Sequence, residues 1–194
     1  MRGVTILGST GSVGVSTLDV IARHRGELRA LALTAHSNDA RLFDQCLEHR
    51  PELAVLLDAA AAERLRERLR VAGLTTRVLH GTAALEEAAR WPQSDYIMAA
   101  IVGAAGLLPT LAAARSGKRL LLANKESLVM SGQLLIETAR SSGTQLIPID
   151  SEHNAIFQCL GSTAATGARP QGVRRIILTA SGGPFLNTPA ERLA

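Results

Sequence analysis

The feature that most constrains the fold of this chain is a regular alternation of short apolar runs with longer helical patterns. Such runs, separated by helical windows of about a dozen residues, are typical of βαβ units and a parallel sheet. The expected strands are Val4–Leu7, Leu28–Thr34, Leu53–Leu57, Thr76–Leu79, Tyr96–Val102, Arg119–Ala123, Gln145–Ile149 and Arg175–Thr179. The expected helices are about Val13–Arg25, Ala40–His49, Ala60–Ala72, Ala83–Arg90, Leu108–Ser116, Glu126–Ser141 and Asn154–Leu160. The sequence therefore predicts an α/β fold with a doubly wound parallel sheet.

The length of 194 residues suits one or two domains of roughly 100–200 residues each. The segment Gly161–Gly172 is small, polar and punctuated by glycine, which predicts a linker before a new unit at about Val173. We expect residues 1–150 to form the doubly wound domain and residues 151–194 to begin a second, catalytic α/β domain. The second part is too short to bury a core by itself.

Charge and aromatic content argue against a nucleic-acid-binding protein. The 21 Lys and Arg exceed the 17 Asp and Glu, and they are spread along the chain rather than gathered in one basic block. Only three Phe, one Trp and one Tyr could stack on bases.

The stretch Tyr96–Ala114 is uncharged, but Gly103, Gly106 and Pro109 interrupt it. We expect a strand, a turn and a helix there, and no membrane span.

The two cysteines, Cys46 and Cys159, match neither a zinc-ligand spacing nor a disulfide framework. They are expected to be free thiols in a reducing compartment. The first residues carry one charge and a short apolar run before a glycine-rich turn, unlike a signal peptide. We therefore expect a cytoplasmic protein.

A glycine-rich turn, Gly8-Ser9-Thr10-Gly11-Ser12-Val13-Gly14, follows the first expected strand and opens the first expected helix. This context favours a dinucleotide-binding turn of the Rossmann type. Gly8 would permit the tight turn, Gly11 would let N–H groups approach a pyrophosphate, and Gly14 would let helix and strand pack closely. The helix N-terminus adds unpaired donors and a positive dipole end. The spacing is one residue wider than the standard fingerprint, so a purely structural turn stays an alternative.

The end of the second expected strand reads Thr34-Ala35-His36-Ser37-Asn38 and has no carboxylate before Asp39. In nicotinamide-binding domains this strand end binds the adenosine ribose, through an acidic residue for a 2′-hydroxyl or a basic neighbour for a 2′-phosphate. His36, Ser37 and Asn38 could each donate a hydrogen bond to a phosphate. The sequence therefore favours NADP over NAD.

Polar clusters follow two further strands, where ligands collect in an open parallel sheet. The first is Asn124-Lys125-Glu126, after Arg119–Ala123. Lys125 could hold a substrate phosphate or hydroxyl, and Asn124 could lie on the nicotinamide side. A helix cap followed by a solvated lysine is the alternative.

The second cluster is Asp150-Ser151-Glu152-His153, after Gln145–Ile149. If this segment stays extended, Asp150 and Glu152 point to the same side and offer oxygen ligands for Mg²⁺ or Mn²⁺. A complete cation site needs a third oxygen ligand or several waters, and a simple helix cap is the alternative. The turn Ser181-Gly182-Gly183 could also take an anion, although it is a weak signal alone.

Together, four segments in this order closely resemble the 1-deoxy-D-xylulose 5-phosphate reductoisomerase family. They are Gly8–Gly14, Ala123–Leu128, Asp150–Gln158 and Ser181–Phe185. The resemblance covers essentially the whole chain and about the first half of the family's length. It implies an enzyme of isoprenoid precursor synthesis that depends on NADPH and on Mg²⁺ or Mn²⁺. Such an enzyme rearranges and reduces 1-deoxy-D-xylulose 5-phosphate to 2-C-methyl-D-erythritol 4-phosphate.

The resemblance also implies roles for individual residues and a homodimer. The implied cofactor contacts are Gly8, Thr10, Gly11, Ser12, Val13, Ser37, Asn38, Asn124 and Glu126. The implied contacts to the phosphorylated sugar are Lys125, Ser151, Glu152 and Ser181. The implied catalytic residues are Lys125, Asp150 and Glu152, of which Asp150 and Glu152 would also bind the metal.

The chain departs from the family pattern at two points. His36-Ser37 stands at the expected 2′-phosphate contact, where the family often has a glycine and a basic residue. The chain also ends at Ala194, before the family's third metal carboxylate, its mobile lid and its C-terminal helical domain. We expect such an N-terminal fragment to bind NADPH but to turn over substrate poorly or not at all.

Two alternatives stay open. A semialdehyde dehydrogenase-like NADP enzyme would need a cysteine nucleophile, and Cys159 lies in an apolar helix pattern that predicts packing instead. A non-catalytic nucleotide-binding module of the Rossmann type is the second. A short-chain dehydrogenase is excluded, because the only tyrosine, Tyr96, is followed four residues later by Ala100 rather than by lysine.

Overall fold

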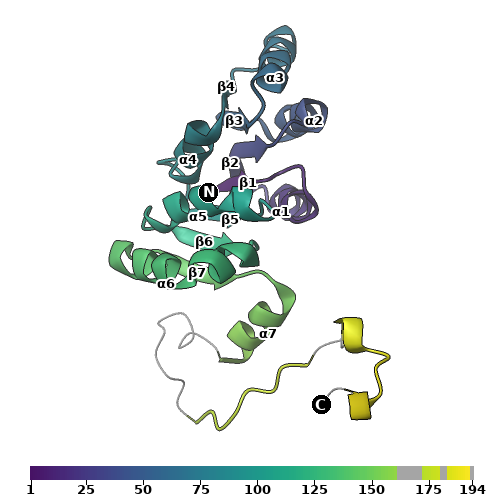
Figure 1. Cartoon of the computed structure of the whole chain (residues 1–194). Helices are drawn as coiled ribbons and strands as arrows, with labels where there is room; N and C mark the ends of the chain where they lie inside the picture. The colour runs from purple at the N-terminus through teal and green to yellow at the C-terminus, as the bar shows by residue number, and fades with distance from the viewer. Residues whose placement is uncertain (161–171, 180–182, 193–194) are drawn as a thin grey trace. The chain divides into compact units, whose positions relative to one another are not determined.

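The computed structural model describes residues 1–160, 172–179 and 183–192 (Figure 1). The chain divides into two compact units, Met1–Asp150 and Ser151–Ala194. The predicted linker falls outside the described residues, apart from Gly172.

The first unit is built on a seven-stranded sheet in which every neighbouring pair of strands is parallel. The strands are β1 (Arg2–Leu7), β2 (Leu28–Ala35), β3 (Leu53–Leu56), β4 (Arg77–His80), β5 (Tyr96–Ala99), β6 (Arg119–Leu122) and β7 (Gln145–Pro148). Their order in the sheet is β4-β3-β2-β1-β5-β6-β7. The chain thus proceeds outward from β1 in one direction and then in the other. The junction of β1 and β5 is therefore the switch point beside which ligands bind in doubly wound sheets.

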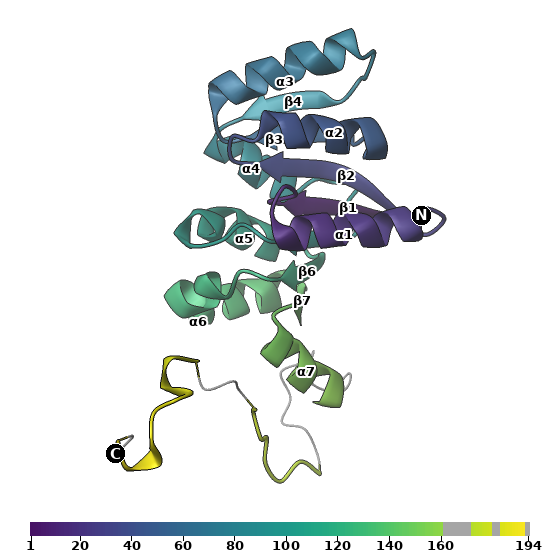
Figure 2. The same cartoon turned by 90° about the vertical axis from the view of Figure 1, so that its right-hand side faces the viewer.

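Helices cover both faces of this sheet, because each crossover between parallel strands must pass over one face. Figures 1 and 2 show α1, α2 and α3 along one face and α4, α5 and α6 along the other. Their bounds are α1 (Ser12–Arg23), α2 (Asp39–His49), α3 (Ala59–Val71), α4 (Thr82–Ala89), α5 (Leu107–Ala114) and α6 (Lys125–Ser142). A short 3-10 turn, η1 (Ala104–Gly106), precedes α5.

Adjacent residues of each strand point to opposite faces, so the sheet has a core on each side. Ile6 packs in one core with Leu42 and Leu65, and Leu7 packs in the other with Leu111 and Leu135. Full burial of one such leucine contributes about 1.5–3 kcal/mol. The central strands are therefore apolar at consecutive positions, which is why the sequence shows runs rather than alternation.

The predicted fold class is confirmed as a Rossmann-like doubly wound sheet, with small errors at the strand ends. The strand predicted to end at residue 102 ends at Ala99, because Gly103 takes a φ of 72° and η1 follows at once. The expected strand, turn and helix are present in this stretch. Among the described residues, no helix is long and apolar enough to cross a membrane.

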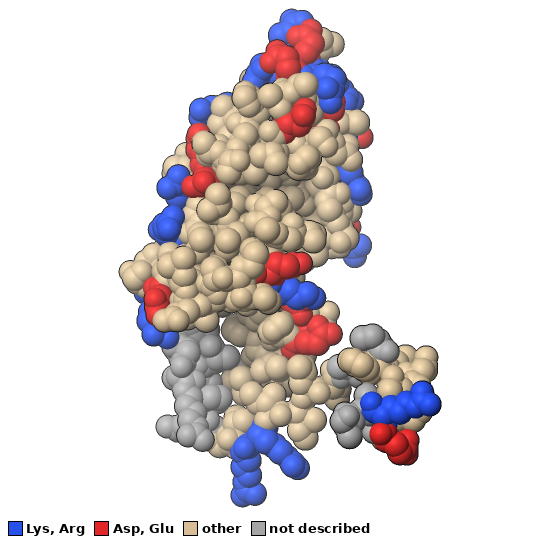
Figure 3. All heavy atoms as spheres, in the orientation of Figure 1, with Lys and Arg blue, Asp and Glu red and all other residues tan. Residues whose placement is uncertain are grey.

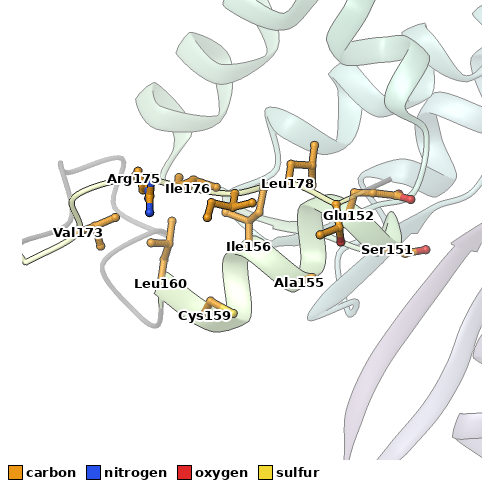
Figure 4. Close-up of a pocket in the computed structure, with 12 residues that line it drawn as sticks. Ser151, Glu152, Ala155, Ile156, Cys159, Leu160, Val173, Arg175, Ile176 and Leu178 are labelled. Atoms are coloured by element: carbon orange, nitrogen blue, oxygen red, sulfur yellow. The ribbon is translucent and has the colours of Figure 1, made fainter. Parts of the chain in front are cut away.

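The second unit contains α7 (Ser151–Leu160) and two 3-10 turns, η3 (Gly183–Phe185) and η4 (Ala190–Arg192). The strand predicted over residues 175–179 is wrong, because residues 173–179 form neither helix nor strand. A strand requires a neighbour for its hydrogen bonds, and the described part of this unit contains no second strand. Ile176 and Leu178 instead line, with Ile156 of α7, a cavity of about 510 Å³ (Figure 4).

The charges of the first unit are mixed rather than segregated. Figure 3 shows acidic and basic side chains interspersed at the end of the unit that carries α3. On α3, Arg66 pairs with Glu63 and Arg70 pairs with Glu67, while Leu65 on the opposite side is buried. This helix therefore exposes a charged face and buries an apolar stripe.

Candidate functional site

The turn between β1 and α1 depends on two of its glycines for packing. Gly8 has a φ of 85°, which favours glycine, and a Cβ there would lie 2.9 Å from the Ala100 carbonyl oxygen. A Cβ on Gly14 would lie 2.4 Å from the Gly8 carbonyl oxygen and 2.5 Å from Ser9 Cα. A Cβ on Gly11 would meet only the Gly8 carbonyl oxygen, at 3.5 Å. Gly8 and Gly14 therefore fix the turn, whereas Gly11 leaves space above it.

The N-terminus of α1 presents unpaired backbone donors. Gly11 is its N-cap residue and provides no side-chain hydrogen bond, and the first turn contains no acidic residue. The N–H of Val15 donates to the Gly11 carbonyl, so the earlier N–H groups of α1 have no partner one helical turn back. These donors and the positive end of the helix dipole suit an anion such as a diphosphate.

A pocket of about 420 Å³ opens beside this turn, at the switch point of the sheet. Its walls come from the glycine turn, the end of β2, the residues after β3, the start of α4, and the segment between β5 and α5. They are formed by Gly8, Thr10, Gly11, Thr34, Ala35, His36, Leu57, Thr82, Leu85, Ala100, Ile101, Val102, Ala104, Ala105 and Leu108. A mostly apolar pocket with a few polar groups is typical of a small-molecule or cofactor site.

A buried polar network that we did not predict from the sequence holds the turn on β2 and α2. The hydroxyl of Thr34 accepts from the Gly8 N–H at 2.9 Å. The Ser9 hydroxyl donates to Gln45 Oε1 at 2.7 Å, and Gln45 Nε2 donates back to the Ser9 carbonyl at 2.9 Å. The only sequence signal was a glutamine on the apolar side of a helical pattern, next to Cys46.

The end of β2 places the predicted polar side chains at the surface. His36, Ser37 and Asn38 are exposed, and Asn38 caps α2 by accepting from the Arg41 N–H at 3.0 Å. The first carboxylate after them, Asp39, is 15% exposed. An anion bound at the end of β2 would therefore lie near a carboxylate whose charge an ion pair already compensates.

That ion pair comes from α3. Arg64 donates to one Asp39 carboxylate oxygen at 2.7 and 3.2 Å, and Arg68 lies 3.8 Å from the other. The hydrogen bond from Arg64 lowers the pKa of Asp39, and partial burial opposes it. Asp39 thus stays ionised with its charge compensated.

Asn124, at the end of β6, has its whole side chain engaged. Its Oδ1 accepts from the Ser127 N–H at 3.0 Å and caps α6. Its Nδ2 donates to the carbonyls of Ile101 and Gly103. Only glycine fits at residue 106, because a Cβ there would lie 2.6 Å from the Ile101 carbonyl oxygen and 2.0 Å from Asn124 Nδ2. The helix-cap alternative therefore describes Asn124, whose side chain also fixes one wall of the pocket.

Lys125 and Asp150 are brought together by the adjacent strands β6 and β7. Lys125 Nζ lies 3.3 Å from Asp150 Oδ2, and the side chains are 63% and 17% exposed respectively. Glu126, in the first turn of α6, is half-buried. The sequence placed Lys125 and Asp150 at strand ends, but it did not predict this ion pair.

The assumption that residues 150–152 stay extended is wrong. α7 begins at Ser151, and Glu152 lies in its first turn, so alternation along a strand does not align Asp150 with Glu152. Ser151 and Glu152 line the cavity of the second unit (Figure 4). Within the described residues, no group of three His, Cys, Asp or Glu side chains could hold a metal ion. Ser181 lies outside the described residues.

Cys46 does not have the environment of an activated nucleophile. Burial raises the pKa of the Cys46 thiol to about 12. Cys159 is exposed on α7, so the expectation that it packs in a core is wrong for the described chain. Neither thiol forms a disulfide.

The sequence profile of the 1-deoxy-D-xylulose 5-phosphate reductoisomerase family matches residues 4–132. The profile of the C-terminal domain of the same enzyme matches residues 146–194. A protein of that name from Methylococcus capsulatus is 61% identical over 194 residues, which are 100% of this chain and 49% of the relative. One from Dechloromonas aromatica is 57% identical over the same shares.

Solved structures agree with the sequence relatives. A crystal structure of DOX-P reductoisomerase in complex with NADPH, fosmidomycin and magnesium matches with a TM-score of 0.91 at 44% identity. That match covers 99% of this chain and 48% of the solved one. The enzyme from Zymomonas mobilis in complex with NADPH matches with a TM-score of 0.88 at 48% identity, over 100% of this chain and 49% of the other.

The two profiles together account for most of the sequence, and the first alone spans more than half of it. The chain spans about half the length of the curated relatives it matches, 49% in the two named above. The fold, the glycine turn and these matches agree, and the chain belongs to the 1-deoxy-D-xylulose 5-phosphate reductoisomerase family.

Proposed function

We propose that this chain forms the NADPH-binding domain, and part of the metal and substrate site, of a 1-deoxy-D-xylulose 5-phosphate reductoisomerase. The complete reaction would be the rearrangement and reduction of 1-deoxy-D-xylulose 5-phosphate to 2-C-methyl-D-erythritol 4-phosphate. The observation that carries the proposal is the uncapped N-terminus of α1 beside the pocket at the switch point. The related structures crystallised with NADPH support it.

The diphosphate of NADPH would lie on the glycine turn, against the backbone of Gly8, Thr10, Gly11, Ser12 and Val13. The open space over Gly11 and the absence of a side-chain cap support this placement. Two neutral hydroxyls, of Thr10 and Ser12, could add hydrogen bonds without adding charge.

The 2′-phosphate would lie at the end of β2, on Ser37 and Asn38 with His36 beside them. These side chains are exposed, and the nearest carboxylate along the chain, Asp39, is already paired with Arg64. An unpaired carboxylate at this point would instead favour the ribose hydroxyl of NAD.

The nicotinamide end would lie toward β6, beside Asn124 and Glu126. Asn124 acts there as a positioning residue, since both ends of its amide hold the surrounding backbone. Fixed backbone geometry is what hydride transfer requires of the protein, because NADPH itself supplies the hydride.

On the family resemblance, the substrate would lie against Lys125, Ser151, Glu152 and Ser181, and Asp150 and Glu152 would be the metal ligands. Carboxylate oxygens suit Mg²⁺ or Mn²⁺, and such an ion, when bound, polarises the substrate's carbonyl and hydroxyl oxygens. Lys125 keeps most of its side chain exposed and can neutralise a substrate anion. Two carboxylates are an incomplete ligand set, and further oxygen ligands or waters would complete it.

Two titrations test the proposal. NADPH fluorescence should rise on binding to the 194-residue chain, and Gly11→Val should weaken binding roughly tenfold or more by filling the diphosphate site. Mn²⁺ binding, followed by electron paramagnetic resonance, should weaken in Asp150→Asn and stay unchanged in Glu137→Gln, an exposed carboxylate of α6. Absence of NADPH binding by the folded wild-type chain would refute the proposal.

A non-catalytic nucleotide-binding module is the second candidate, favoured by the missing third metal ligand among the described residues. The same variants distinguish the two functions. A module that only senses nucleotide would lose nothing in Asp150→Asn, whereas the reductoisomerase site would lose Mn²⁺.

We also propose that the protein is cytoplasmic and that it forms a homodimer. The free thiols Cys46 and Cys159 support a reducing compartment. The homodimer rests on the family resemblance, and light scattering of the purified protein would test it.

A further inference from the structure

Four neighbouring strands begin with polar residues, at the N-terminal ends of the strands and therefore opposite the glycine turn. Arg2, Tyr96, Arg119 and Gln145 are the first residues of β1, β5, β6 and β7. The parallel register pairs Tyr96 with Arg119 and Arg119 with Gln145. Equivalent positions of adjacent parallel strands place their side chains on the same face, so Tyr96, Arg119 and Gln145 form a row. Tyr96 pairs with Val4 of β1, and Arg2 lies two residues before Val4 and therefore on the same face.

Hydrogen bonds connect the row. The guanidinium groups of Arg2 and Arg119 both donate to the Tyr96 hydroxyl, the latter at 2.8 Å. Arg119 Nε also donates to Gln145 Oε1 at 3.0 Å. Two cations thus converge on one neutral oxygen, although like charges repel at this separation.

These side chains border a pocket of about 560 Å³, which also includes Lys118 and Asp95. The half-buried Lys118 donates to the carbonyls of Trp91 and Pro92. The Asp95 carboxylate accepts from the Gly3 N–H at 2.7 Å. In the part of the chain that the structure describes, no carboxylate forms an ion pair with either arginine or with Lys118.

The pocket therefore carries three cationic groups and one carboxylate, a local charge of about +2 that matches a phosphate dianion. The planar forks of two arginines suit phosphate oxygens better than lysine alone would. Pro92, Ser94, Gly117 and Gly143 form the rest of the lining, and the two glycines add no side chain to it.

We infer that the pocket bordered by Arg2, Tyr96 and Arg119 is a second anion site, which binds the phosphate group of a small molecule. It lies at the opposite edge of the sheet from the nucleotide pocket and shares no residue with it. The inference does not depend on the proposed NADPH function.

Tyr96 provides a local readout, because it is the only tyrosine of the chain. Partial burial raises the pKa of its phenol, but hydrogen bonds and charge from Arg2 and Arg119 outweigh this and lower the pKa overall. A bound phosphate would compensate the two guanidinium charges. It should therefore raise the Tyr96 pKa toward its ordinary value.

The test is a spectrophotometric titration of Tyr96 with inorganic phosphate, against chloride at equal ionic strength. Phosphate should raise the Tyr96 pKa and chloride should not. At neutral pH, the fluorescence of the only tryptophan, Trp91, should give the same phosphate affinity. Tighter binding of inorganic pyrophosphate would indicate a diphosphate ligand, and equal binding a monophosphate.

Variants separate this site from the nucleotide turn. Arg119→Gln should weaken phosphate binding about tenfold, Arg119→Lys should weaken it less, and NADPH binding should not change in either. Arg115→Gln, an exposed arginine outside the pocket, is the matched control. The inference is overturned if phosphate leaves both Tyr96 and Trp91 unaffected, or if folded Arg119→Gln binds phosphate as tightly as the wild type.

Discussion

At the scale of one residue, α1 can lie close to the turn after β1 because Gly14 has no side chain. An added Cβ would press on backbone atoms of Gly8 and Ser9, which cannot move without displacing the whole turn. We expect Gly14→Ala to lower the free energy of unfolding by about 1–3 kcal/mol and to weaken NADPH binding. Urea unfolding and NADPH fluorescence measure the two effects.

Gly11→Ala is the matched comparison, because its Cβ has only an ordinary contact. It should cost under about 1 kcal/mol of stability, yet still weaken NADPH binding by occupying space above the turn. Equal destabilisation by the two substitutions would contradict the assigned packing role of Gly14.

At the scale of secondary-structure elements, the side chain of Asn124 connects the start of α6 to the segment after β5. Asn124→Ala removes a helix cap, which costs about 1 kcal/mol, and also leaves two loop carbonyls without their donor. We expect a loss of stability together with weaker NADPH binding, measured by urea unfolding and fluorescence titration.

Asp58→Ala provides the control for capping alone. Asp58 caps α3 by accepting from the Ala61 N–H at 2.6 Å, and it does not line the nucleotide pocket. Its removal should cost a similar amount of stability and leave NADPH affinity unchanged. If both variants lose NADPH affinity equally, Asn124 has no special role in positioning the pocket.

At the scale of the whole molecule, stability should fall on acidification in part through His49. Its side chain is 6% exposed, and burial lowers its pKa, with Glu48 opposing and Arg25 reinforcing that shift. As the pH falls below about 6.5, the unfolded chain takes up a proton that folded His49 resists. The neutral imidazole of His49 therefore contributes its full stability above about pH 6.5. This contribution is lost as the pH falls through the lowered pKa of His49 in the folded chain.

Thermal unfolding of the wild type and of His49→Gln across this range would measure the effect. Each kcal/mol lost should lower Tm by about 2–4 °C. The variant should show a shallower decline in Tm between neutral and mildly acidic pH. Identical declines would mean that His49 does not contribute to the acid sensitivity.

The amino-acid sequence by itself determined the order of strands and helices in the first unit, because hydrophobic periodicity and glycine preferences are local. It also identified the glycine turn, Lys125 and Asp150 as functional candidates. It misplaced the strand expected over residues 175–179 and the extended form of residues 150–152, because a strand depends on a partner that no local pattern specifies.

Only the tertiary structure decided which distant side chains meet. The pairing of Asp39 with Arg64, the hold of Asn124 on the Ile101 carbonyl, and the convergence of Arg2 and Arg119 on one phenol all join residues more than twenty positions apart. These contacts follow from the order and register of parallel strands, which the packing of the whole sheet determines. The periodicity of the sequence predicts which face a residue occupies, but the neighbouring strand determines what it touches there.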